Sequence, residues 1–72
     1  MTTISLNQVI EFINAKTSEV LNLVCIGSKT NFSDFSEEYY FSNQEMTFTY
    51  QMSNRDGLLY DENGNFVANY QF

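Results

Sequence analysis

Apolar and polar side chains alternate over residues 46–52, near the middle of the chain. The apolar members are Met46, Phe48, Tyr50 and Met52, and the polar ones between them are Thr47, Thr49 and Gln51. A period of two places the two sets on opposite faces, as a half-buried antiparallel strand requires. We therefore predict a central strand over residues 45–52, around which the rest of the chain is organised.

The length of 72 residues predicts one domain, residues 1–72, with a modest core. Hydrophobic burial in a chain of this size supplies only about 3–5 kcal/mol. One cysteine and no histidine exclude an internal disulfide and the usual zinc sites. Five tyrosines and seven phenylalanines provide much apolar area instead, so we expect a folded chain.

Residues 5–16 have the pattern of an amphipathic helix. Ser5 and Gln8 have the spacing of a capping box, with Ile4 and Val9 at the positions of a hydrophobic staple. The apolar stripe, at i, i+3, i+4 and i+7, is Leu6, Val9, Ile10 and Ile13. We expect this helix to pack on a sheet, in preference to binding a partner helix.

The segment 20–26 is a nearly continuous apolar run that ends at Gly27, which suits a strand covered on both faces. Leu21, Val24 and Cys25 are also helically spaced, so periodicity leaves a second helix open. We expect Cys25 to be a buried small hydrophobe, since no histidine is present to activate it.

Residues 27–36 have the composition of a loop with two aromatic anchors, Phe32 and Phe35. We expect both to be buried in the core. If they are exposed, they become the best candidates for an interaction surface.

The remaining segments predict a meander. Residues 38–41 and the central strand form a hairpin through 42–45. Turn signals at 54–57 and 61–65 separate strands at 58–60 and 66–72, with Asn63-Gly64 supplying a positive φ. The predicted fold is therefore α+β, an N-terminal helix on an antiparallel sheet of about four to five strands.

No catalytic, metal or cofactor motif is apparent. Asp61, Asn63 and Asn65 resemble the start of a calcium loop, but Phe66 and Phe72 stand where glycine and a bidentate acid are needed. Adjacent carboxylates at 37–38 and 61–62 point to opposite faces of a strand, unlike a glycosidase pair. We expect a non-enzymatic protein without cofactors.

Nine acids against three bases give a formal charge of −6, which argues against direct contact with nucleic acid or anionic membranes. All of the net charge belongs to residues 34–72. Neither a signal peptide nor a membrane span is recognisable, so we expect a cytoplasmic protein.

Strand ends and turns carry most of these acids, with tyrosines among them. They predict a negatively charged strip that is either a solubility device or complementary to a basic protein surface. The candidate partner-binding residues are Asp34, Glu37, Glu38, Tyr39, Tyr40, Glu45, Asp56, Asp61 and Glu62.

In size, charge and layout the chain resembles the small acidic inhibitor proteins of bacteriophages, of the anti-CRISPR and anti-restriction type, some of which mimic DNA. The resemblance extends over the whole chain and includes no diagnostic motif. It implies inhibition of a basic nucleoprotein complex, such as a CRISPR effector or a nuclease, by occupying its surface.

Two alternatives stay open. An immunity protein or antitoxin against a basic nuclease uses the same electrostatics with a different partner. A self-assembling module, including a homodimer, would use the last strand, 66–72, as an unprotected sheet edge that pairs with its twin.

Overall fold

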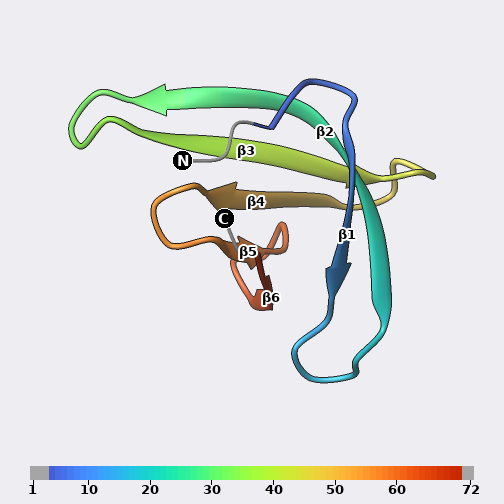
Figure 1. The fold of residues 1–72 in the computed structure, drawn as a ribbon. Coiled ribbons are helices and arrows are strands. Elements are labelled where there is room, and N and C mark those ends of the chain that lie inside the picture. The colour runs from blue at the N-terminus through green and yellow to red at the C-terminus, as the bar shows by residue number, and fades with distance from the viewer. Residues whose placement is uncertain (1–3, 71–72) are drawn as a thin grey trace.

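The computed structural model describes residues 4–70, and these residues form an all-β fold of six strands. The strands are β1 (Val9–Ile13), β2 (Val20–Asn31), β3 (Ser36–Asn43), β4 (Thr49–Ser53), β5 (Leu58–Tyr60) and β6 (Phe66–Asn69). Each strand pairs antiparallel with the next, so the sheet order follows the chain order. The sheet curls into a half-barrel that brings its two edges, β1 and β6, near one another (Figure 1).

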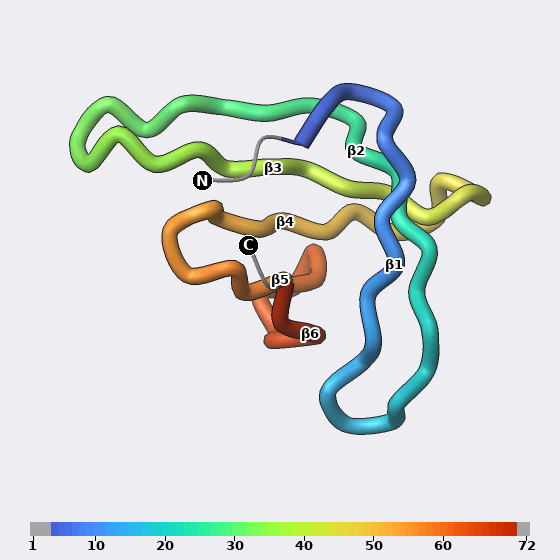
Figure 2. Tube along the Cα trace, in the orientation of Figure 1, coloured from blue at the N-terminus to red at the C-terminus, as the bar shows by residue number. Residues whose placement is uncertain are grey.

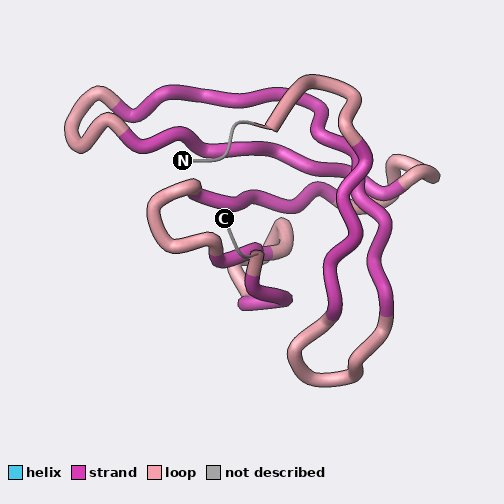
Figure 3. The backbone as a smooth tube through the Cα atoms, viewed as in Figure 1, coloured by secondary structure: helices cyan, strands magenta, loops and turns pink. Residues whose placement is uncertain are grey.

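The predicted N-terminal helix is wrong, and with it the α+β class. The described residues contain no helix, and residues 9–13 are a strand (Figure 3). The Ser5–Gln8 contact does form, because the Ser5 N–H donates to Gln8 Oε1 at 3.0 Å. It closes a turn in which Asn7 has a φ of 68°, and the chain leaves this turn extended. No helix of the described chain could span a membrane.

β2 corrects the prediction for residues 20–26 in both length and burial. It is a strand, not a helix, but it continues past Gly27 to Asn31. A β-bulge between Cys25 and Gly27 absorbs one extra residue and lets pairing with β3 resume. Leu23 and Cys25 are buried while Val20 and Ile26 are exposed, so only one face is covered.

The central strand begins later than predicted. β4 starts at Thr49, and Met46 and Phe48 lie exposed in the connection that precedes it. Asn43 holds this connection, since its side chain accepts the Thr47 N–H at 2.9 Å and donates to Thr47 Oγ1 at 2.6 Å. The turn therefore moves to residues 44–48.

The rest of the meander is as predicted. The turns at 54–57 and 61–65 are present, with Gly57 at a φ of 66° and Gly64 at 82°. The strand at 58–60 agrees with the pattern, and the predicted strand 66–72 is present as β6 but ends at Asn69. Tyr70 is not part of it, and residues 71–72 lie outside the described residues.

The core fills the concave face of the sheet. Phe12 of β1 packs edge-on against Phe41 of β3, with 5.4 Å between the ring centroids. It also packs in a tilted arrangement against Tyr70, with 5.6 Å between the centroids. The fully buried members of the core are Phe12, Leu23, Cys25, Tyr39, Phe41, Met52, Leu59 and Ala68. The prediction that Cys25 is a buried small hydrophobe is confirmed.

The antiparallel order sends the turns to two ends of the sheet. The β2–β3 and β4–β5 turns share one end, which we call the tip end (Figure 2). The other three turns belong to the opposite end of their strands, which we call the far end. This division decides which predicted site residues can act together.

We expect Gly64→Ala to lower the free energy of unfolding by about 1–2 kcal/mol, because an L-residue is strained at this φ. Gly27→Ala is the matched control: neither added Cβ would meet a non-neighbouring atom within 4 Å, and Gly27 lacks a positive φ. We expect it to be neutral or stabilising by about 0.4–1 kcal/mol. Urea denaturation measures both, and equal effects would contradict the turn geometry.

Candidate functional site

Phe32 and Phe35 stand out at the tip end, where the β2–β3 turn leaves them 80% and 79% exposed. The prediction that they are buried in the core is wrong. The β2–β3 hairpin that carries them extends to the left of Figure 1, where the β4–β5 turn also lies. We call these two side chains, with the turn 32–35, the aromatic tip.

Hydrogen bonds within the turn fix its backbone. Asn31 Oδ1 accepts the N–H of Ser33 at 3.1 Å and its hydroxyl at 2.7 Å. Asp34 Oδ1 accepts the N–H of Ser36 at 3.0 Å and its hydroxyl at 2.6 Å. Phe35 is the middle residue of the second of these turns and is held there at a φ of 61°, a left-handed conformation that is costly for a bulky residue.

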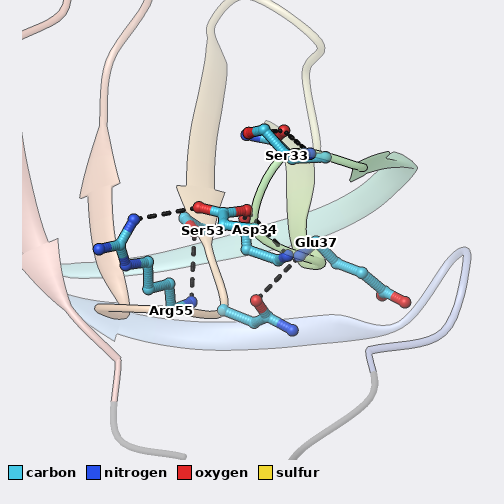
Figure 4. Close-up of polar contacts among 8 residues, drawn as sticks. Ser33, Asp34, Glu37, Ser53 and Arg55 are labelled. Atoms are coloured by element: carbon cyan, nitrogen blue, oxygen red, sulfur yellow. Dashed lines mark hydrogen bonds and ion pairs between the residues drawn. The ribbon is translucent and has the colours of Figure 1, made fainter.

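The neighbouring β4–β5 turn braces the tip. Arg55 Nη1 pairs with Asp34 Oδ2 at 3.0 Å, the one ion pair among the described residues, and the two side chains point toward one another in Figure 4. Asn54 and Glu37 exchange two bonds of 2.9 Å: Asn54 Oδ1 accepts the Glu37 N–H, and the Asn54 N–H donates to the Glu37 carbonyl. An open hollow of about 410 Å³, lined in part by Phe35 and Arg55, lies between the turns.

These contacts change the chemistry of Asp34. The hydrogen bonds from the hydroxyl and N–H of Ser36, with the positive charge of Arg55 as a smaller cause, lower the pKa of Asp34 below its ordinary value. Asp34 is thus a structural group of the turn. Its second carboxylate oxygen is shared with Arg55, which leaves it less free to meet a partner than its position in the sequence suggests.

The acids of β3 lie on opposite faces, as predicted from their adjacency. The Tyr39 hydroxyl donates to Glu37 Oε2 at 2.7 Å, and the Tyr40 hydroxyl donates to Glu38 Oε2 at 3.2 Å. Tyr39 is only 1% exposed, so it belongs to the core and offers no contact surface. Burial, with a smaller contribution from the carboxylate beside each, raises the pKa of both tyrosines.

The predicted acids do not form a single strip. Asp34, Glu37, Glu38 and Asp56 belong to the tip end, with Arg55 and Lys29 as the cations there. Glu45, Asp61 and Glu62 belong to the far end, where Glu19 joins them and Lys16 is the cation. The negative charge is therefore divided between two poles of the molecule.

At the far end, Asp61 and Glu62 line a groove of about 360 Å³ together with Glu19. Phe48 and Tyr50 also line this groove. Asp61 is partly used within the turn: Oδ1 accepts the N–H groups of Asn63 and Asn65, both at 2.9 Å. Those bonds, led by that from Asn65, lower the pKa of Asp61. Burial raises the pKa of Tyr50, and the negative charges of Asp61 and Glu62 add to the rise.

The structure adds Phe32 and Phe35 to the candidate site and removes Tyr39 from it. The sequence contained a signal that Phe32 and Phe35 are exposed, because two aromatic residues in a segment of loop composition have few strand partners. Among residues 4–70, no cluster of three or more His, Cys, Asp or Glu side chains could hold a metal ion. No family model matches the chain, and no match was found among curated proteins or solved structures.

We expect the Asp34 pKa to rise toward its ordinary value in Ser36→Ala, and to rise less in Arg55→Gln, because the Ser36 bonds are the larger cause. Because the folded pKa is below the unfolded one, ionised Asp34 stabilises the fold above the unfolded pKa. This stabilisation is lost as the pH falls through the folded pKa. Carboxyl ¹³C titration measures each pKa, and a larger rise in Arg55→Gln would contradict this order.

Proposed function

We propose that this chain is a non-enzymatic binding protein that docks on a basic surface of a nucleic-acid-binding protein complex and blocks it. The observation that carries the proposal is the aromatic tip. Two phenylalanines are held in solvent by a hydrogen-bonded turn, one of them at a strained backbone position. Strain and apolar exposure both cost free energy, and such features are concentrated at binding sites.

The tip and the acids have complementary roles in this proposal. Aromatic side chains that enter a partner's pocket provide most of the binding energy at an interface, because they bury large areas with few rotamers to freeze. Glu38 and Asp56 beside the tip, and the excess of acids over bases in the whole chain, attract a basic surface and repel nucleic acid. The chain would thus occupy a surface where nucleic acid otherwise binds.

The resemblance to phage-encoded anti-CRISPR and anti-restriction inhibitors agrees with this proposal, and we assign the chain to the host cytoplasm on the same basis. An immunity protein against a basic nuclease would use the same tip and charges. The identity of the captured partner separates the two, since an effector complex favours the inhibitor and a single secreted or toxic nuclease favours the immunity protein.

The test is affinity capture from bacterial lysate with tagged wild-type chain and variants, washed at low and then high salt. Truncating one aromatic side chain that is buried at an interface reduces the binding free energy by about 2 kcal/mol or more. We therefore expect Phe32→Ser/Phe35→Ser to weaken partner binding by roughly 30-fold or more. Met46→Ser is the matched control, because Met46 is an exposed apolar residue at the far end. It should leave binding unchanged.

Charge reversal separates the two poles. Glu37→Lys/Glu38→Lys should reduce recovery and its salt sensitivity, whereas Glu45→Lys/Glu62→Lys, with the same change in net charge at the far end, should reduce it less. Full recovery with the double phenylalanine variant, or loss of binding only with the far-end variant, would contradict the assignment of the site to the aromatic tip.

A further inference from the structure

β1 forms one edge of the sheet, and its ladder with β2 fixes the direction of its peptide groups. The Cys25 N–H donates to the Gln8 carbonyl at 2.9 Å, and the Asn14 N–H donates to the Glu19 carbonyl at 2.8 Å. Along an antiparallel pair, only alternate residues bond to the neighbouring strand. The even-numbered residues of β1, Ile10 and Phe12, therefore bond to β2, and the odd-numbered residues of β1 direct their N–H and C=O groups away from it.

Among residues 4–70, no strand pairs with this edge of the half-barrel. In the described chain β1 and β6 form no ladder, and the Ala15 N–H, just beyond β1, donates to the Val67 carbonyl at 2.9 Å. The two edge strands are thus joined by a hydrogen bond that lies just after the C-terminal end of β1. Among residues 4–70, Val9, Glu11 and Ile13 form no backbone hydrogen bond on the side away from β2, and the N–H and C=O groups that point there are those that an added strand would use.

The side chains of the same three residues give this edge its chemistry. Val9 is 55% exposed and Ile13 57%, and their cross-strand partners on β2 are Val24 and Val20. Glu11, also exposed, lies between the two aliphatic pairs. The outer face of the edge therefore presents an aliphatic, an acidic and an aliphatic position in turn.

We propose that the β1 edge binds an extended segment of a protein partner as an added antiparallel strand. The occupant has a lysine or arginine opposite Glu11 and aliphatic residues opposite Val9 and Ile13. A second copy of this chain is the poorer occupant: the register that pairs Val9 with Ile13 of a twin also sets Glu11 against Glu11, and like charges in directly opposed positions are destabilising. The proposal is independent of the aromatic tip.

The test uses a seven-residue peptide, acetylated and amidated, that alternates threonine with valine, lysine and valine at its second, fourth and sixth positions. Titration into ¹⁵N-labelled protein should shift the amide signals of Val9, Glu11 and Ile13. We expect the peptide with glutamate in place of lysine to bind about fivefold more weakly at low salt. Glu11→Lys should reverse this preference, and Phe32→Ser/Phe35→Ser should leave it unchanged.

A backbone control separates strand pairing from simple charge attraction. The fourth residue of the peptide directs its N–H toward β1, whereas the third directs its N–H away. N-methylation of the lysine should therefore abolish binding, and N-methylation of the preceding threonine should preserve it. Equal effects of the two methylations, shifts confined to the aromatic tip, or no binding would overturn the proposal. A concentration-dependent dimer that loses the β1 amide signals would overturn it in favour of the twin.

Discussion

The fold depends on the contact that Phe12 makes across the concave face of the sheet. A sheet with one apolar face needs a cover, and residues 4–70 provide neither a helix nor a second sheet. The sheet must cover itself by curling, and Phe12 of the first strand meets Phe41 and Tyr70 as it does so. This aromatic contact joins the two ends of the sequence. It also explains how a short chain with a single cysteine buries a core.

Curling has a consequence for function. Because the core buries the concave face, a partner can bind at the turns at the two ends, at the convex face or at the open edge of β1. The aromatic tip and the β1 edge both expose large apolar side chains at such places. A turn built from Asn31, Asp34 and Ser36 shows how the cost of displaying phenylalanine is met: the polar groups of the backbone are bonded locally, so the turn needs no core beneath it.

The sequence predicted the meander because its information is local. Gly57 and Gly64 adopt the positive φ that the Asp-Gly and Asn-Gly pairs predict, and alternation fixes the faces of the flanking strands. The N-terminal helix failed for a non-local reason. Leu6, Val9, Ile10 and Ile13 fit a helical stripe, but pairing with β2 buries only Ile10 and leaves Val9 and Ile13 outside. The same Ser5–Gln8 bond that can start a helix here closes a turn, so local chemistry could not choose between the two.

The candidate site was predictable in part for a related reason. Counting carboxylates finds the acidic residues, but it does not say which oxygens the fold already uses. Asp61 Oδ1 accepts two N–H groups that close its turn, and Asp34 accepts the hydroxyl and the N–H of Ser36 together with the guanidinium of Arg55. These bonds lower the pKa of both carboxyl groups. The charge pattern did not single out Glu11. It becomes a candidate for recognition only because it lies between Val9 and Ile13 on an open edge. An acid's part in recognition follows from which of its oxygens, and which neighbouring backbone groups, the fold leaves unpaired.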